Sequence, residues 1–372
     1  MTVDGMSGAA PRLRSLDGLR GIAAMAVVLN HAAVVLYGSD FFRPRPPFSA
    51  LWNGHAAVIV FFIMSGLVLS LPYWRGAADG WRGFMVRRLF RIYPLFAVSI
   101  LIVPVLIWLV SATGGHWRDQ PSWSDLLADL AMVDRPVDQA LNGSTWSLIH
   151  EMRLSIVFPG LILAMRLAGR RAVPLALLFS ICASFAADFV AHDFVVLSWL
   201  LSASFVWLFV LGAEIGRNLP AIQARLGRLP PLPAVSIALG LLAVLSFDRW
   251  DGIAGIRLFL FHDVAAGLLV ILAVGYAPLV RLLEIKPVHW LGRVSYSLYL
   301  IHGPLLWAMH GVVPAPVPRV AAVALAVVLS LLAAEPFYRL VERPGIRIGH
   351  RLAARVGMRP ALSQGQEEAP AK

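Results

Sequence analysis

The side chains best suited to chemistry begin near the N-terminus, where Arg20 and His31 share one apolar segment, residues 16–37. On an α-helix, eleven residues separate two side chains by about 20° around the axis and roughly 16 Å along it. Asp17 precedes Arg20 by three residues and falls on the same face. Because ionisable groups are costly in hydrocarbon, they mark pathways or reaction centres. The segment predicts a charged entrance and a deeper imidazole base; an orienting arginine with a structural histidine is the alternative.

A second pair of cationic residues, Arg88 and Arg91, lies three residues apart ahead of another apolar segment. This spacing places both side chains on one helix face. Guanidinium groups present a rigid donor fork that matches phosphoryl oxygens. The pair predicts a site for a phosphate-bearing ligand arriving from the cytoplasm, with the positive-inside rule as the alternative explanation.

The segment that begins at Trp146 and Ser147 places Glu151 one turn further along. A carboxylate there could orient or charge-balance a catalytic imidazole. An ion pair with Arg153 or with another helix is the alternative. Trp146 and Ser147 are candidates for lining a substrate pocket.

Two further candidates, Tyr299 and His302, lie three residues apart on one face of a late apolar segment. They are expected either to line the same cavity or to form a structural hydrogen bond between helices. His262 and Asp263 are expected near an outer loop, facing water. The sequence contains no H-E-x-x-H or comparable ligand spacing, so no metal is predicted.

The composition is that of an integral membrane protein. Of 372 residues, 59% are hydrophobic and only 14% are charged. Windows of about 20 residues indicate about ten transmembrane helices. These lie near residues 16–37, 56–73, 92–112, 146–167, 172–191, 194–216, 232–247, 256–276, 289–311 and 318–341. The predicted fold is therefore an all-α transmembrane bundle.

Charge sets the predicted topology. The formal net charge is +11, but the arginines are scattered over the ends of apolar segments, which argues against nucleic-acid binding. The positive-inside rule then places both termini in the cytoplasm. The longest polar interval, residues 114–142, is expected to be an outer loop with one amphipathic helix around Ser124–Met132. An acceptor could bind beside it; the alternative is a solvated loop with interfacial tryptophans. Cys182 is the only cysteine, so no disulfide is predicted.

Five short motifs occur in order along nearly the whole chain. They are LDGLRG at 16–21 with ten residues between Arg20 and His31, FFIMSG at 61–66, RLFRIYP at 88–94, WSL at 146–148 followed by Glu151 and Phe158-Pro159, and SYSLYLIH at 295–302. In this combination the chain resembles the acyltransferase 3 family, integral membrane enzymes that move an acyl group onto sugars and other hydroxyl acceptors. After Glu151 the family commonly has an aromatic pair, where this chain has Leu154 and Ser155.

The resemblance implies an acyl-CoA donor, usually acetyl-CoA, with Arg20, Arg88 and Arg91 near the donor and His31 as the essential histidine. Asp17 is assigned with these donor residues. No tightly bound cofactor is expected. Some family members carry an additional soluble esterase-like domain, which is not expected within this chain. The expected location is a bacterial-type inner membrane, with acyl-CoA, a carbohydrate or glycolipid acceptor and the lipid bilayer as partners.

The predicted organisation is a cytoplasmic segment over residues 1–14, a transmembrane acyltransferase domain over 15–345, and a basic and then disordered cytoplasmic tail over 346–372. The predicted activity is transfer of an acyl group, in particular acetyl, to a hydroxyl, with His31 as general base or acyl carrier and Glu151 beside it. The alternative is a secondary transporter or flippase that uses His31, Glu151 and Arg20 as an ion relay. A non-catalytic sensor or scaffold is a third possibility.

Overall fold

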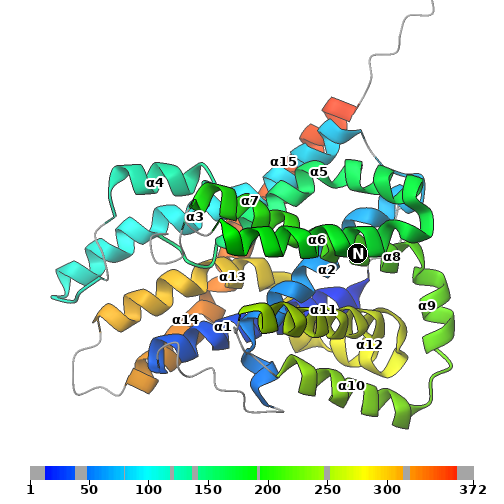
Figure 1. Ribbon diagram of the computed structural model, residues 1–372. Coiled ribbons are helices and arrows are strands. Elements are labelled where there is room, and N and C mark those ends of the chain that lie inside the picture. Colours follow the sequence, from blue (N-terminus) through cyan, green and yellow to red (C-terminus); the bar gives the residue numbers. More distant parts are fainter. Residues whose placement is uncertain are drawn as a thin grey trace, which may run out of the picture.

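The computed structural model describes residues 13–37, 48–78, 80–117, 121–135, 141–190, 193–246, 252–312 and 319–357, and every regular element in these ranges is helical (Figure 1). The predicted N-terminal segment up to residue 12 and the end of the predicted tail, residues 358–372, lie outside the described residues. The part of that tail from Ile346 to Gly357 belongs to a helix.

All ten predicted apolar segments are helical. The long helices are α1 (Arg14–Tyr37), α2 (Gly54–Trp74), α3 (Trp81–Ala112), α5 (Trp146–Ala168), α6 (Ala172–Phe189), α10 (Pro231–Leu245), α11 (Gly252–Gly275), α13 (Lys286–Val312) and α14 (Arg319–Phe337). The segment at 194–216 breaks at Phe205 into α7 (Phe194–Ser204) and α8 (Val206–Arg217). Shorter elements are α4 (Trp123–Leu130), α9 (Leu219–Leu226), α12 (Ala277–Leu283), α15 (Arg343–Gly357), the 3₁₀ turns Phe48–Trp52 and Gly169–Arg171, and a π turn, Tyr338–Glu342.

The chain is a multi-pass membrane protein. Within the described residues, six helices are long and apolar enough to cross a membrane. The pair Leu260–Gly275 and Ala277–Leu283, bent by 89°, would make a seventh if it counts as one span. The count of about ten spans and the cytoplasmic position of both termini stay predictions.

Glycines let the central helices approach one another at backbone distance. A Cβ atom on Gly21 of α1 would lie 2.5 Å from the backbone nitrogen of Gly292 in α13. Likewise, a Cβ on Gly66 of α2 would lie 2.2 Å from the carbonyl oxygen of Phe209 in α8. Small residues at such contacts are typical of helix packing in membranes. The glycines of the LDGLRG and FFIMSG motifs therefore serve packing.

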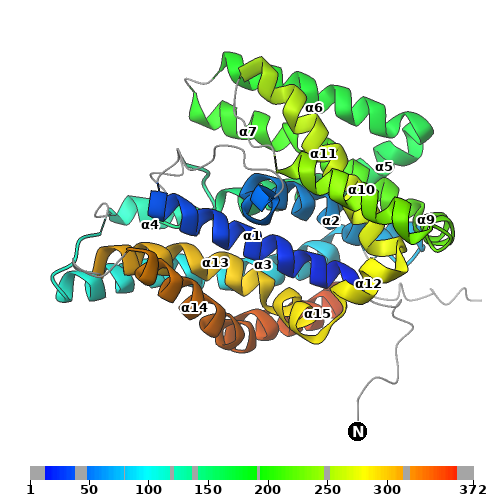
Figure 2. The same ribbon diagram turned by 90° about the horizontal axis from the view of Figure 1, so that it is seen from below.

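The helices form a bundle in which α1 lies between α13 and α2 (Figure 2). One end of the bundle carries α4, and the opposite end carries α9 and α12, in both views. The first turn of α1 points toward the α9 and α12 end, and its last turn toward the α4 end. Helix α15 packs along α3.

The expected amphipathic helix in the polar interval is confirmed as α4. Ser122 caps it: its hydroxyl accepts a hydrogen bond from the Asp125 backbone, and Asp125 in turn accepts from the Ser122 backbone. This reciprocal capping box satisfies two amide groups that the helix leaves without intrahelical partners. This capping box fixes the start of the helix at Trp123, one residue before the predicted start around Ser124.

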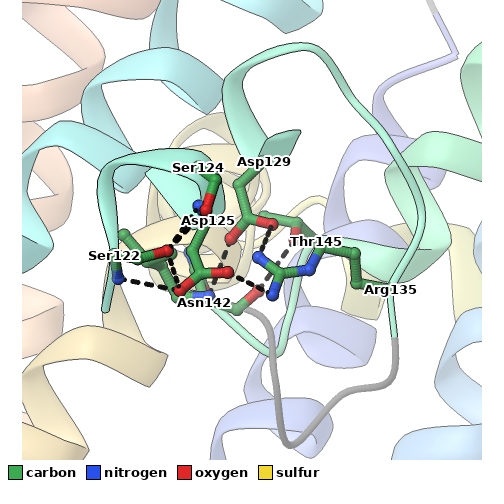
Figure 3. A network of polar contacts seen from close by, with 8 residues as sticks. Ser122, Ser124, Asp125, Asp129, Arg135, Asn142 and Thr145 are labelled. Atoms are coloured by element: carbon green, nitrogen blue, oxygen red, sulfur yellow. Dashed lines mark hydrogen bonds and ion pairs between the residues drawn. The ribbon is translucent and has the colours of Figure 1, made fainter. Parts of the chain in front are cut away.

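Polar contacts tie α4 to the chain that follows it. Figure 3 shows the carboxylates of Asp125 and Asp129 turned toward the guanidinium of Arg135, at 2.5 and 3.6 Å. Asp129 also accepts a hydrogen bond from the backbone of Leu141 at 2.7 Å. Burial raises the pKa of Asp129, whereas hydrogen bonds from Ser122 lower the pKa of Asp125. These residues, together with Ser122, are called the α4 network below.

The expectation that His262 and Asp263 face water is wrong. Their exposed fractions are 2% and 8%. Asp263 accepts a hydrogen bond from the indole of Trp207 at 3.0 Å, which ties α11 to α8. The position of these two residues near a polar interval of the sequence did not indicate that they would be buried, with Trp207 of α8 covering Asp263.

Candidate active site

A cavity of about 970 Å³ opens among α1, α2, α3, α13 and α15. Eight of its lining residues are arginines, and two are carboxylates, Asp17 and Glu342. The arginines are Arg20, Arg75, Arg87, Arg88, Arg91, Arg293, Arg343 and Arg347. This cavity is called the arginine basin below. Its positive charge creates a field that attracts anions.

The arginines of the basin differ in what they contact. Arg20 lies 3.8 Å from Asp17, one turn earlier on α1. Arg88 is 9% exposed and donates a charge-assisted hydrogen bond to Glu151. By contrast, Arg91, Arg343 and Arg347 form no ion pair within the described part of the chain. Arg20 and Arg88 therefore have a carboxylate nearby, whereas the exposed Arg343 and Arg347 have none within the described residues.

Glu151 takes its polar contacts from two other helices. Besides Arg88 of α3, the Ser65 hydroxyl of α2 donates to the same carboxylate oxygen at 2.7 Å. Arg88 also donates to the Ser155 hydroxyl at 3.0 Å. Glu151 thus forms the ion pair with another helix that was the alternative to a partnership with an imidazole. Ser155, one of the departures from the family pattern, helps to hold Arg88.

A smaller cavity of about 70 Å³ adjoins the basin. The two share five lining residues, Arg20, Ser65, Arg88, Arg91 and Ser295. Ser147 and Tyr299 line the smaller cavity, and their hydroxyls are 2.7 Å apart. The Tyr299 ring centroid lies 6.0 Å from that of His302. Tyr299 therefore stands between the smaller cavity and the next polar group along α13.

That group is a pair of histidines. Nδ1 of His31 in α1 lies 2.8 Å from Nε2 of His302 in α13, and the rings are stacked with centroids 5.0 Å apart. The Ser144 hydroxyl lies 3.5 Å from the same His302 nitrogen. Asn142, two residues earlier, donates from its amide to the Leu300 carbonyl at 2.8 Å. The segment after the α4 network, which carries Asn142 and Ser144, therefore packs beside the histidine pair.

Hydrogen bonds assign the tautomers of the pair. Nδ1 of His302 lies 3.1 Å from the Leu298 carbonyl oxygen, which can only accept. In a neutral imidazole the proton is therefore on Nδ1 of His302, and Nε2 carries a lone pair. His31 must then donate from its own Nδ1, which leaves Nε2 of His31 as a basic nitrogen.

The two histidines meet because α1 and α13 run parallel from a common contact. Gly21 and Gly292 touch, and His31 and His302 each follow ten residues later. Equal rise per residue along both helices carries the two side chains to the same level, about 15 Å from the glycine contact.

The predicted site residues therefore fall into two groups. Asp17, Arg20, Arg88, Arg91 and Glu151 gather at the basin and the smaller cavity, which Ser147 and Tyr299 also line. His31 and His302 form the second group. Trp146 lies apart from both cavities: its ring packs against His150 at 5.8 Å, beside residues of the α4 network.

The structure adds two pairs of residues that the sequence patterns did not assign to the site, Arg343 with Arg347 and Asn142 with Ser144. The positive-inside rule alone explains Arg343 and Arg347 as topological charge, although their spacing of four residues indicates one helix face. Asn142 and Ser144 precede the segment that begins at Trp146, and nothing in their spacing indicates a contact with α13. Among the described residues, no three histidine, cysteine or acidic side chains are arranged to hold a metal ion.

Comparison with known proteins supports the motif assignment. A family model described as "Acyltransferase domain" matches residues 13–339. The chain is 30% identical over 257 residues to the acyltransferase MdmB of Streptomyces mycarofaciens, covering 65% of this chain and 59% of MdmB. It is 23% identical over 377 residues to the peptidoglycan O-acetyltransferase OatA of Listeria monocytogenes, covering 89% of this chain and 55% of OatA.

A third relative, the putative membrane-bound transacylase BcsY of Komagataeibacter xylinus, is 26% identical over 363 residues, covering 91% of this chain and 84% of BcsY. The chain spans somewhat more than half the length of MdmB and OatA. No solved structure matches it. Because the family model covers nearly the whole chain, this membrane protein belongs to the acyltransferase 3 family.

Proposed function

We propose that this protein is a membrane O-acyltransferase that transfers an acyl group, in particular acetyl, from acyl-CoA to a hydroxyl of a carbohydrate or glycoconjugate. The observation that carries the proposal is the placement of α1, which contributes Arg20 to the arginine basin and His31 to the histidine pair. One helix thereby links a site for a polyanion with a site for a base.

The basin suits the donor. Acyl-CoA carries its negative charge on phosphates at one end and its thioester at the other, joined by a neutral arm. Arginine forks match phosphoryl oxygens, and eight of them line the basin. The buried pair Arg88–Glu151 adds little net charge, so it fits beside the neutral arm.

Reaching the histidine pair requires the structure to open. At about 70 Å³ the smaller cavity holds a few water molecules but not the arm of CoA. The hydrogen bond between Ser147 and Tyr299 joins α5 to α13 at its inner wall. We infer that these two hydroxyls separate when the thioester arm passes toward His31.

Transfer then needs one base. Nε2 of His31 takes the proton of the acceptor hydroxyl as its oxygen attacks the thioester carbonyl carbon. The carbon–sulfur bond breaks, an ester forms on the acceptor, and the leaving CoA thiolate takes up the proton held on Nε2 of His31, which restores the base. In the alternative sequence the same nitrogen attacks the thioester carbonyl first and the CoA thiolate leaves; the acceptor hydroxyl then takes the acyl group from the nitrogen, and its proton passes to the thiolate.

The acceptor class is inferred from relatives. OatA is named as a peptidoglycan O-acetyltransferase. Its acceptor is therefore peptidoglycan, a polymer that contains carbohydrate. In this chain, Asn142 and Ser144 bring the polar interval against the histidine pair. This contact supports approach of the acceptor from the α4 end and of the donor from the basin.

The test is acyl transfer and slow thioester hydrolysis by the purified protein with radiolabelled acetyl-CoA. His31→Gln should retain acetyl-CoA binding and lose at least about 100-fold in turnover. Arg91→Gln should weaken binding without unfolding the protein, because Arg91 forms no ion pair within the described residues. Substantial turnover in a correctly folded His31→Gln protein would eliminate the mechanism. Absence of both binding and cleavage in the wild type would favour the transporter interpretation.

A further inference from the structure

We propose that α15 forms the outer wall of the donor site, where Arg343 and Arg347 bind the phosphate groups at the nucleotide end of CoA. This inference rests on the proposed function. Arg343, Arg347 and His350 follow one another at intervals of four and three residues, which places them on one helix face. All three are exposed, and all three line the arginine basin.

Glycines on a different face of α15 hold the face that carries Arg343, Arg347 and His350 in position. A Cβ on Gly345 would lie 2.7 Å from the Phe90 carbonyl oxygen, and a Cβ on Gly349 would lie 2.7 Å from the Phe90 Cβ. The helix therefore packs on α3 at backbone distance through a G-x-x-x-G pattern. Since neither glycine tolerates a side chain, α15 cannot rotate its arginines away from the basin without losing this contact.

The distribution of charge indicates which part of the ligand lies there. Deep in the basin, Arg88 is neutralised by Glu151, and Arg20 lies near Asp17. At α15, Arg343 and Arg347 have no carboxylate partner within the described part of the chain. A ligand that is anionic at its outer end and neutral at its inner end matches this gradient. In acyl-CoA, the outer end carries a pyrophosphate and a 3′-phosphate.

Anionic lipid headgroups offer the same phosphate chemistry and are the other source to test. A lipid surface would use the whole basic helix, including Arg351 and Arg355, which are also exposed but do not line the basin. The location of Arg343 and Arg347 inside a cavity shared with buried Arg88 favours the donor nucleotide.

The test compares Arg343→Gln/Arg347→Gln with a control of equal charge change on the same helix, Arg351→Gln/Arg355→Gln. Equilibrium dissociation constants are measured for CoA, 3′-dephospho-CoA and pantetheine with the protein in nanodiscs of neutral lipid and, separately, in nanodiscs that contain anionic lipid, and turnover of acetyl-CoA is recorded in parallel. Loss of two charge-assisted contacts should weaken CoA binding by at least about 10-fold in the first variant only. Its affinity for pantetheine should be unchanged, and its preference for CoA over 3′-dephospho-CoA should shrink.

Equal weakening in both variants, weakening that appears only with anionic lipid, or no change in CoA affinity would overturn the proposal. So would a parallel loss of pantetheine affinity, which would indicate a structural defect. If the wild type binds CoA but does not transfer acetyl, the proposed function fails while the binding comparison still decides the role of α15. If it does not bind CoA at all, both fail.

Discussion

The arginine basin and the α4 network both contain many charged side chains, but carboxylates balance the positive charge in the network and are outnumbered by arginines in the basin. In the network, Arg135 lies between Asp125 and Asp129, and each carboxylate has further hydrogen bonds from the backbone. In the basin, arginines outnumber carboxylates eight to two. Charged side chains that form ion pairs with one another hold a loop in place, whereas excess positive charge around a cavity favours binding of an anionic ligand.

The Arg88–Glu151 ion pair gives the strongest test of this comparison, because its two charges cancel although it lies in a region with an excess of positive charge. Removing one member of a buried ion pair leaves the other uncompensated and costs about 3–5 kcal/mol. Arg88→Leu should therefore lower thermal stability strongly, and Arg88→Leu/Glu151→Leu should recover much of it. If the double variant also bound CoA like the wild type, the pair would be purely structural.

The histidine pair sharpens the comparison, since its hydrogen bonds serve orientation rather than charge. His302→Leu removes the acceptor for Nδ1 of His31 and should lower kcat by roughly 100-fold. His302→Gln keeps an acceptor oxygen and should retain at least about a tenth of wild-type kcat, with the KM for acetyl-CoA unchanged in both. Equal loss in the two variants, with equal loss of thermal stability, would reduce His302 to a packing role.

Arg135 provides the matching test in the α4 network. Arg135→Met should lower stability by about 1 kcal/mol, as is typical of partly exposed ion pairs, and leave CoA affinity unchanged. The measurements are thermal unfolding and CoA binding. A loss of CoA affinity comparable to that of Arg91→Gln would break the comparison between the two regions.

The smallest effect concerns pH. Burial raises the pKa of Asp129 in the folded protein, so the folded state binds a proton more readily than the unfolded state and stability rises as pH falls. Asp129→Asn keeps an acceptor for the Leu141 amide and removes this titration. Between pH 7 and pH 5 the wild type should gain slightly more in melting temperature than the variant. A larger gain in the variant would reverse the sign of the effect.

Local sequence patterns were sufficient to predict the helices, but they did not predict which side chains of different helices contact one another. Apolar runs predicted all ten long segments, and the polar interval predicted a short helix around Ser124–Met132, because both patterns are properties of neighbouring residues. Grouping of Arg20 with Arg88 came from the family resemblance. Nothing local could show that Glu151 contacts Arg88, since the partner depends on how α5 packs against α3. The position of Arg343 in the wall of the basin was not predicted, because basic residues near a helix end have a sufficient topological explanation.

The parallel contact of α1 and α13 also has a consequence for sequence variation. Insertion or deletion of one residue between Gly21 and His31 would turn the imidazole by about 100° and separate it from His302. An equal change between Gly292 and His302 would do the same, and only paired changes would preserve the contact. A glycine followed ten residues later by a histidine, present in both helices, is therefore a signature by which other chains that carry this histidine pair can be recognised.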